Sequence, residues 1–324
     1  MNNRMYVSCG DLNGIGLEVF SKAVQSYLES SQFIIFLPLQ LQYLLPNSIL
    51  LEPHTLPLPH QNGLFISPIS GYDNYIPEYG KFSQICGNIS HTSFIASINK
   101  LKSDFSAGFL TLPIHKKSFT SAGSPFAGHT EYIGHLLGEK NPLMVLMNEE
   151  MKVALLTVHI PIQNISGKIT KSLIYEKAIQ YDKSLKNDFG ISNPKIALLG
   201  LNPHAGDEGV IGNEEIEIYK PAIESLQSGG VNIYGPFASD GFFGAKLYKQ
   251  FDGILASYHD QGLIPVKLSG MDHGVNFSAG SSIVRTSPDH GTAYDIAGKN
   301  IASPESTKNA IEWNIKIRQK RMTA

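Results

Sequence analysis

The chain is poor in several features, and each shortage narrows the kind of protein it can be. It has only two cysteines in 324 residues, Cys9 and Cys86. Neither cysteine stands at the spacing of a metal or redox motif, so we expect two small buried side chains. This sparse cysteine content argues against a disulfide-stapled secreted scaffold and is typical of a reducing compartment.

Net charge and long apolar runs are also lacking. The formal net charge of −2 gives no basic footprint for nucleic acid. The most apolar stretch, residues 33–51, is too interrupted to span a bilayer, because it is broken by Pro38, Gln40, Gln42 and Pro46. The first ten residues do not show the pattern of a signal peptide. We therefore expect a cytoplasmic protein with no nucleic-acid or membrane partner.

Strand-like and helix-like segments alternate along the chain, which predicts an α/β fold with a largely parallel sheet. The expected strands are Met5–Cys9, Phe33–Leu37, Ala107–Leu112, Leu143–Met147, Val153–Val158, Ile196–Leu201, Val231–Tyr234 and Gly253–Ser257. The expected helices are Gly14–Leu28, Lys81–Leu101, His129–Leu137, Thr170–Leu185, Glu214–Gln227, Gly241–Gln250 and Pro304–Lys316. The segment 52–77 is rich in proline and glycine, and we expect an extended surface connection there.

The length fits two domains, and the linker-like segment 121–125 (Ser-Ala-Gly-Ser-Pro) marks a plausible division. We expect a first α/β domain at 1–125 plus about 286–324, and a second at about 126–285.

Three histidines, His159, His204 and His259, each follow an apolar run that reads as a buried strand. Ligands bind at the carboxyl ends of strands in open α/β sheets, so the three imidazoles could converge there. Three imidazoles with one open position form a known catalytic zinc arrangement. The alternative is that each histidine is an ordinary hydrogen-bonding loop residue.

Other polar segments point to an anionic ligand. The turn 10–16 (Gly-Asp-Leu-Asn-Gly-Ile-Gly) leads from a strand into a helix, so it is either an anion-binding turn or an ordinary one. It does not match the G-x-G-x-x-G fingerprint. His129 and Thr130 begin a predicted helix, where free N–H groups favour anions. Lys267, Asn276 and Arg285 follow His259 at intervals of eight, nine and nine residues. The planar guanidinium of arginine suits phosphate or carboxylate.

Taken together, these segments resemble the 4-hydroxythreonine-4-phosphate dehydrogenase family of pyridoxal phosphate biosynthesis. The matching pieces occur in family order and span residues 10 to about 298. They are Gly10–Glu18, Gly128–Glu131, Thr157–Pro161, Gly200–Gly206, Gly235-Pro236, Tyr258–Leu263, Val275-Asn276 and Arg285–Ala293. The strings N-P-H-A-G, Y-H-D-Q-G and R-T-S-x-D-H-G-T-A are highly specific.

The resemblance implies an isocitrate/isopropylmalate dehydrogenase-like fold, with two α/β/α domains and a cleft between them. It implies that the second domain carries the dimer contacts and a divalent metal on His159, His204 and His259. It further implies that the substrate contacts His129, Thr130, Lys267, Asn276 and Arg285. The family's active site lies at a homodimer interface, so metal ligands from both subunits are expected.

The chain departs from the family pattern at a few positions. In the first motif the family usually has prolines where this chain has Leu12 and Leu17, and commonly a small residue at Asn13. The family's tail after N-P-H-A-G is usually glycine-rich, but here it reads Asp-Glu-Gly-Val-Ile-Gly (207–212). The Asp-Thr pair that usually comes after the Gly-Pro motif reads Asp240-Gly241 here. The metal and substrate positions are intact, so these departures bear on cofactor contacts and substrate choice.

The expected reaction is oxidation of 4-phosphooxy-L-threonine to 2-amino-3-oxo-4-phosphooxybutanoate, which decarboxylates to 3-amino-2-oxopropyl phosphate. This oxidoreductase needs NAD or NADP, and one cation (zinc, magnesium, manganese or cobalt) to polarise the hydroxyl. Three groups could act as the base that accepts the hydroxyl proton: Lys267, Asp240 and a metal-bound water. The alternatives are a related dehydrogenase of threonate or erythronate 4-phosphate, and a metal-dependent hydrolase or lyase without nicotinamide. A non-catalytic metal scaffold has no need for Lys267, Asn276 and Arg285.

Overall fold

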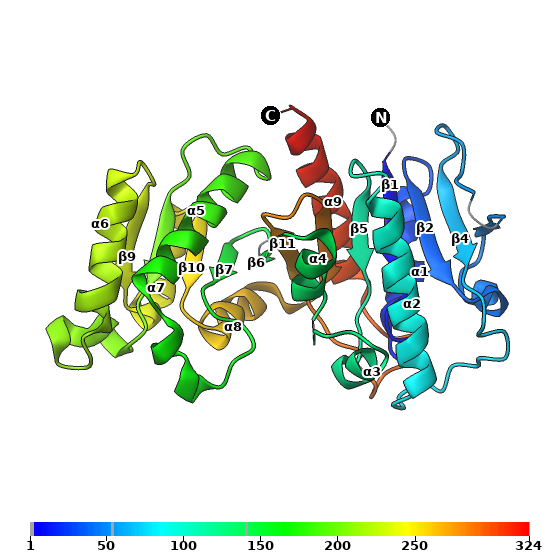
Figure 1. The fold of residues 1–324 in the computed structure, drawn as a ribbon, viewed down its shortest axis with the longest axis horizontal. Helices are drawn as coiled ribbons and strands as arrows, with labels where there is room; N and C mark the ends of the chain where they lie inside the picture. Colours follow the sequence, from blue (N-terminus) through cyan, green and yellow to red (C-terminus); the bar gives the residue numbers. More distant parts are fainter. Residues whose placement is uncertain (1–2, 53–54, 127, 140–141, 324) are drawn as a thin grey trace. The chain divides into compact units, whose positions relative to one another are not determined.

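The computed structural model describes residues 3–52, 55–126, 128–139 and 142–323. The chain divides into two compact units, which are described one at a time. Unit 1 consists of Met1–Pro142 and Ser281–Arg318, and unit 2 of Leu143–Gly280 and Gln319–Ala324. Figure 1 shows the ribbon, coloured along the sequence.

Unit 1 contains a six-stranded parallel array in the order β3-β4-β2-β1-β5-β12. Its strands are β1 (Arg4–Ser8), β2 (Gln32–Leu37), β3 (Ile49–Leu50), β4 (Gly63–Pro68), β5 (Gly108–Thr111) and β12 (Val284–Pro288). Its helices are α1 (Gly16–Val24), α2 (Gln84–Leu101), α3 (Lys116–Ser121) and α4 (His129–Leu137), and α9 (Glu305–Thr323) begins in it. Short 3-10 turns occupy Gln25–Tyr27 (η1) and Leu39–Leu44 (η2).

Helices cover both faces of this array, and neighbouring residues of β5 show how. Side chains alternate along a strand, so Gly108 and Phe109 face opposite sides. Phe109 packs on Phe94 of α2, with ring centroids 5.7 Å apart. A Cβ atom at Gly108 would lie 1.9 Å from Oδ1 of Asn314 in α9, so only glycine lets α9 approach the strand. In Figure 1, α2 crosses the strands of this unit.

Unit 2 contains a mixed array in the order β11-β6-β7-β10-β8-β9. The strands are β6 (Leu143–Met147), β7 (Lys152–Leu155), β8 (Ile196–Leu199), β9 (Ile233–Phe237), β10 (Gly253–Ala256) and β11 (Val275–Ala279). The antiparallel pairs are β11–β6 and β6–β7, and the remaining pairs are parallel. Its helices are α5 (Lys171–Asn187), α6 (Lys220–Ser228), α7 (Ser239–Gly244) and α8 (His259–Gly270). Its short helical turns are η3 (Ile162–Asn164), η4 (Ser166–Lys168), η5 (Pro203–Gly209), η6 (Glu215–Tyr219), η7 (Leu247–Gln250) and η8 (Met271–His273).

The core of unit 2 follows the same alternation. Val153, Leu155 and Ala256 point to the face that α8 covers, where a Cβ atom on Gly262 would touch all three side chains. Gly253 points to the other face, against Tyr181 and Leu185 of α5. The strands that precede the three histidines are therefore buried on both faces, as their apolar runs predict.

The α/β class and the largely parallel pairing are confirmed, and the strands expected at Leu143–Met147 and Val153–Val158 form the antiparallel pair β6–β7. The expectation for 52–77 was wrong in part, because Gly63–Pro68 forms β4 and pairs with β2 and β3. The sequence analysis also missed β11 and β12. Phe94 stacks on His129, and Phe119 meets the same imidazole edge-on, which ties α4 to unit 1.

Within the described ranges, every helix is too short or too polar to cross a membrane.

A buried amide on α9 provides a test of this packing. Asn314 is fully buried, and its Nδ2 donates to the carbonyl oxygens of Phe109 and Val284 and to Oγ1 of Thr286, at 3.0–3.1 Å. We expect Asn314→Ala to lower the free energy of unfolding by about 1–3 kcal/mol, because it removes these bonds from buried groups. Urea denaturation measures the loss.

The matched control is Lys316→Ala on the same helix, whose ion pair with Glu312 is exposed. It should change stability by less than about 0.5 kcal/mol. Equal effects of the two substitutions would contradict the packing described for α9.

Candidate active site

A cluster of polar side chains lies at one edge of unit 1. Arg285 comes from β12, Thr111 ends β5, and His129 and Thr130 begin α4. The Arg285 guanidinium donates to Thr111 Oγ1 from Nε at 3.0 Å and from Nη2 at 2.6 Å. It also lies 3.4 Å from Thr130 Oγ1 and 3.4 Å from His129 Nδ1. Three residues expected from the sequence to contact substrate are thus brought together.

Burial sets the charge states in this cluster. Arg285 and His129 are only 4% and 7% exposed. Burial lowers the pKa of Arg285 to about 10, so the guanidinium stays positive at neutral pH. Burial, and secondly the charge of Arg285, hold the pKa of His129 well below its usual range. His129 is therefore neutral beside a cation.

A neutral His129 that accepts a hydrogen bond at Nδ1 carries its proton on Nε2. Nε2 is buried and has no hydrogen-bond partner among the residues that the structure describes. An unsatisfied buried donor is costly, so this N–H is suited to a ligand oxygen. The cluster therefore presents a fixed cation, a neutral N–H donor, and the amino end of a nine-residue helix whose N-cap, Gly128, gives no side-chain bond. Such a combination binds an anion.

The three histidines of the sequence analysis all lie in unit 2, after adjacent parallel strands. His159 follows β7, His259 follows β10 and begins α8, and His204 follows β8 within η5. These strands are neighbours in the order β7-β10-β8, so each histidine leaves the carboxyl edge of the array. The strand order thus brings the backbone of all three histidines to one sheet edge.

The imidazoles are only partly gathered. The rings of His159 and His259 lie 5.7 Å apart between centroids, and His259 Nδ1 lies 2.6 Å from the Asp260 carboxylate. Among the described residues of this one chain, no three His, Cys, Asp or Glu side chains are grouped to hold a metal ion. The donor chemistry fits a divalent metal, since His259 has the carboxylate neighbour that commonly orients a ligating imidazole.

The loop that carries His204 is strained and firmly held. Five successive residues, 204–208, have positive φ, and only Gly206 among them is a glycine. Left-handed backbone is costly for other residues and is concentrated at functional sites. Glu215, 1% exposed, stabilises the loop by accepting the backbone N–H groups of Leu201 and Asn202 at 2.8 and 2.7 Å.

A second network joins the strand ends beneath these histidines. Ser257 Oγ donates to the Leu199 carbonyl, and Thr157 Oγ1 donates to the Ser257 carbonyl, which links β10 to β8 and β7. Gln261 accepts the Ser257 N–H and donates to the Gly200 carbonyl and to Ser239 Oγ at the start of α7. Gln261 therefore fixes α7, which carries Asp240, against the loop that leads to His204.

The remaining candidates also lie in unit 2. Lys267 is half-buried on α8, and Asp240 is exposed on α7. Asn276 lies on β11, and its Oδ1 is buried with no hydrogen-bond partner in the described part of the chain, so it can accept from a ligand donor.

The turn 10–16, named here the cofactor turn because its glycines and following helix suit a nucleotide, is built on a buried network in unit 1. Asp11 Oδ1 accepts the Asn13 N–H, and Asp11 Oδ2 accepts the Tyr294 hydroxyl at 2.8 Å. Ile15 N–H donates to the Thr292 carbonyl at 3.0 Å, so the turn is joined to loop 289–302. A Cβ atom at Gly14 would lie 2.7 Å from that carbonyl oxygen, so glycine permits the close approach.

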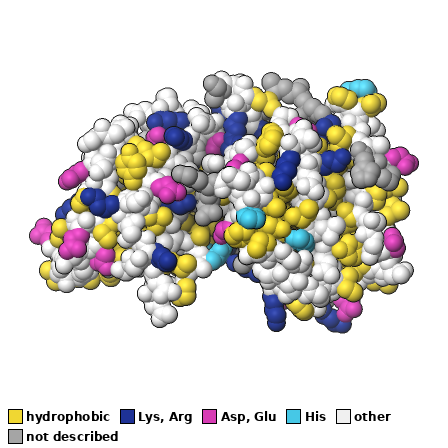
Figure 2. All heavy atoms as spheres, in the orientation of Figure 1, with side chains coloured by type: hydrophobic (Ala, Val, Ile, Leu, Met, Phe, Trp, Pro, Cys, Tyr) yellow, Lys and Arg dark blue, Asp and Glu magenta, His cyan; other side chains and the backbone are white. Residues whose placement is uncertain are grey.

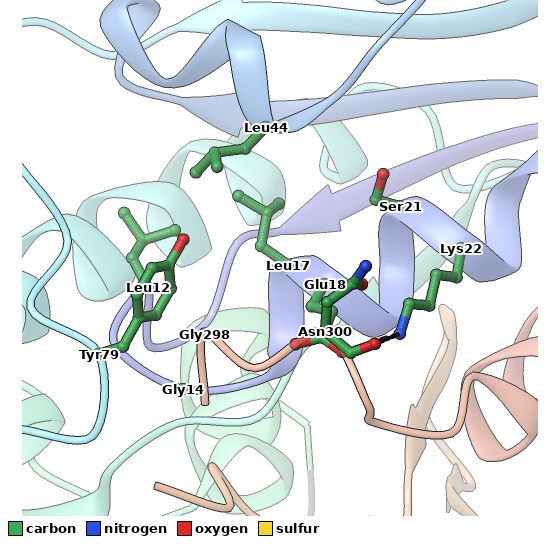
Figure 3. A pocket seen from close by; sticks show the side chains of 10 residues that line it. All are labelled: Leu12, Gly14, Leu17, Glu18, Ser21, Lys22, Leu44, Tyr79, Gly298 and Asn300. Atoms are coloured by element: carbon green, nitrogen blue, oxygen red, sulfur yellow. Dashed lines mark hydrogen bonds and ion pairs between the residues drawn. The ribbon is translucent and has the colours of Figure 1, made fainter. Parts of the chain in front are cut away.

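A cavity of about 260 Å³ adjoins this turn. Figure 3 shows Leu12, Leu17, Leu44 and the Tyr79 ring on its apolar side, and Glu18, Lys22 and Asn300 on its polar side. Two of the positions that depart from the family pattern, Leu12 and Leu17, thus line the cavity.

The sequence analysis missed four residues that shape these sites: Thr111, Gln261, Glu215 and Tyr294. Gln261 lies within the Y-H-D-Q-G string, so the sequence did carry a signal for its role. Thr111 and Tyr294 act through contacts with residues far along the chain, and Glu215 through backbone N–H groups across a loop, neither of which spacing reveals.

Comparison with known proteins places this geometry in context. The family model for "Pyridoxal phosphate biosynthetic protein PdxA" matches residues 39–314. The 4-hydroxythreonine-4-phosphate dehydrogenase of Bacteroides thetaiotaomicron is 40% identical over 95% of this chain and 86% of its own length. The enzyme of that name from a Sulfurihydrogenibium species is 44% identical over 81% of this chain and 80% of its own. The crystal structure of the Klebsiella pneumoniae 4-hydroxythreonine-4-phosphate dehydrogenase superposes with a TM-score of 0.82 at 30% identity, covering 98% of this chain and 99% of that one.

The lowered pKa of His129 predicts how stability depends on pH. Unfolded histidine titrates near pH 6.5, whereas folded His129 takes up its proton only at lower pH. Below pH 6.5 the unfolded state therefore binds the extra proton, and stability falls as the pH falls. We expect His129→Phe, which keeps an aromatic ring against Phe94, to remove this dependence.

Urea denaturation of both proteins between pH 8 and pH 5 measures the effect. The wild type should lose stability more steeply than the variant below pH 6.5, by up to about 1.4 kcal/mol per pH unit. Parallel profiles would show that His129 is not held neutral.

Proposed function

This chain belongs to the PdxA family, the 4-hydroxythreonine-4-phosphate dehydrogenases of pyridoxal phosphate biosynthesis, and from that premise we propose how it binds and oxidises its substrate. It is an oxidoreductase, and a dehydrogenase of this kind uses a nicotinamide cofactor. The proposed reaction converts 4-phosphooxy-L-threonine to 2-amino-3-oxo-4-phosphooxybutanoate, which then loses carbon dioxide. The observation that carries the proposal is the buried Arg285–His129 cluster, because it is built for an anion such as the substrate phosphate.

In this proposal Arg285, the Nε2–H of neutral His129 and the Thr130 end of α4 hold the phosphate. Thr111 positions the guanidinium through two hydrogen bonds. Lys267 and Asn276 contact the same substrate, and the unpaired Oδ1 of Asn276 supports a role as acceptor from the substrate's hydroxyl or amino group. A phosphate held this firmly orients the reacting carbon.

His159, His204 and His259 would hold a divalent cation, with zinc, magnesium, manganese and cobalt all compatible with a site completed by substrate oxygens. We propose that the set is completed across a homodimer. Each histidine is followed within nine residues by an exposed large apolar side chain: Ile162 at 80%, Val210 at 80%, and Ile264 and Leu268 at 56% and 83%. Figure 2 shows apolar side chains exposed between charged ones on the visible surface of unit 2. Apolar side chains grouped along the chain with the ligands favour a partner subunit at this edge.

We propose that the nicotinamide cofactor, NAD or NADP, binds along the cofactor turn and loop 289–302. This location is supported by the meeting of both segments at the carboxyl edge of parallel strands β1 and β12, where α/β folds bind nucleotides. The expected location of the protein in the cell is the cytoplasm, in keeping with two buried free thiols, Cys9 and Cys86.

The chain's own residues then divide the work. When both are bound, the cation would acidify the substrate hydroxyl and polarise the developing carbonyl, and the nicotinamide would accept the hydride. Lys267 Nζ and the Asp240 carboxylate are the side-chain candidates to take the hydroxyl proton. Arg285 and His129 anchor the phosphate through both the oxidation and the decarboxylation, so the substrate keeps its orientation.

A substrate and cofactor panel tests the function. We expect reduced nicotinamide to form from 4-phosphooxy-L-threonine, to stop when metal is chelated, and to return with a divalent cation. Threonate and erythronate 4-phosphates should react at least about tenfold less efficiently, because they lack the amino group. His159→Ala should lose metal content and turnover, whereas His60→Ala, an exposed histidine in unit 1, should keep both. No turnover of 4-phosphooxy-L-threonine with either nicotinamide would overturn the assignment.

Arg285→Gln tests the phosphate site separately. We expect kcat/KM for the phosphorylated substrate to fall about 100-fold or more, because a charged, forked donor is lost. Arg4→Gln is the matched control, since Arg4 pairs with Asp104 at the opposite end of its strand and should leave kinetics unchanged. Wild-type kinetics for Arg285→Gln would contradict the site.

A further inference from the structure

Asn13 makes more structural contacts than a turn residue requires. It is completely buried. Its Oδ1 accepts the Tyr75 hydroxyl at 2.6 Å and the Glu78 N–H at 2.8 Å, and its Nδ2 donates to the Lys81 carbonyl at 2.8 Å. Its own carbonyl accepts the Gly80 N–H at 2.8 Å. One side chain and one peptide group thus tie residues 75–81, named here the tethered segment, to the cofactor turn.

The tethered segment also packs closely against loop 289–302. A Cβ atom at Gly298 would lie 2.7 Å from the Tyr79 ring, and one at Gly80 would lie 2.8 Å from the Tyr294 carbonyl oxygen. Tyr294 itself donates to Asp11 in the cofactor turn. The tethered segment therefore contacts both segments to which we assign the nicotinamide site, and Tyr79 also lines the cavity in Figure 3.

Nothing in the turn itself demands an amide at this position. The Asn13 N–H is already fixed by Asp11, and the turn reaches Thr292 through Ile15. The amide group serves only the tethered segment, and the matching family motif commonly has a small residue there. A small side chain could not reach Tyr75, Glu78 and Lys81.

We infer that Asn13 is a positioning residue for nicotinamide binding, which acts by holding the tethered segment, and through it loop 289–302, in the binding geometry. The inference rests on the proposed location of the cofactor. It assigns Asn13 no contact with the reacting atoms. Its loss therefore affects cofactor affinity, while the Arg285 phosphate site keeps its own supports.

Asn13→Ala tests the inference, with Gln32→Ala as the matched control. Gln32 is another fully buried amide of unit 1, and it ties a different extended segment by donating to the carbonyls of Leu58 and Gln61 at the opposite end of the strands. Both substitutions should lower thermal stability. Only Asn13→Ala should raise KM for the nicotinamide, by about tenfold, with kcat and KM for the phosphorylated substrate within about twofold of wild type.

Hydrogen exchange gives a readout that does not depend on activity. Asn13→Ala should speed exchange at Glu78 and Gly80 and in loop 289–302, whereas Gln32→Ala should not. Tyr75→Phe, which removes one bond to Asn13, should act in the same direction but less strongly, and serves if Asn13→Ala fails to fold.

Two failures can be told apart. If wild type binds no nicotinamide, the proposed function fails whatever the variants do. If wild type is active but Asn13→Ala matches Gln32→Ala in KM for nicotinamide, Asn13 is merely structural and the inference is overturned. Unchanged exchange in loop 289–302 of Asn13→Ala would also overturn it.

Discussion

The buried charge of Arg285 determines how the polar cluster of unit 1 is arranged. A guanidinium taken out of water must be given hydrogen-bond acceptors, and here Thr111, Thr130 and His129 provide them. Because His129 must accept at Nδ1 and stay neutral, its remaining proton lies on a buried nitrogen that has no partner in the described residues. One buried cation thus creates a second donor beside it, and the pair is suited to the anion that we propose it binds.

Unit 2 is organised by a different constraint, the carboxyl edge of three adjacent parallel strands. The edge collects His159, His204 and His259, and hydrogen bonds through Ser257 and Gln261 fix the strand ends beneath them. Holding His204 requires a run of left-handed backbone, and Glu215 stabilises it from within the core. The sheet therefore supplies rigid supports, and the histidines extend from it toward solvent, where in our proposal a second subunit would complete the metal site.

The sequence predicted well those features that follow from local periodicity. Apolar runs located the strands before all three histidines, because strands buried on both faces have few polar positions. It failed for β12, where Val-Arg-Thr-Ser-Pro has no apolar alternation, so no strand was predicted at Arg285, which lies in a buried strand. Motif residues such as His129 and Arg285 were found, but Thr111 was not, because its role comes from contact with a residue 174 positions away. The tie made by Asn13 to residues 75–81 was hidden for the same reason.

The protonation state of His129 in solution tests the central claim most directly. Imidazole nitrogen-15 NMR, with His129→Phe used for assignment, reports which ring nitrogen carries the proton. We expect a neutral ring with its proton on Nε2 at pH 6, and a shift of the Nε2 resonance when 4-phosphooxy-L-threonine binds. A doubly protonated ring at pH 6, or a bound substrate that leaves Nε2 unchanged, would contradict it.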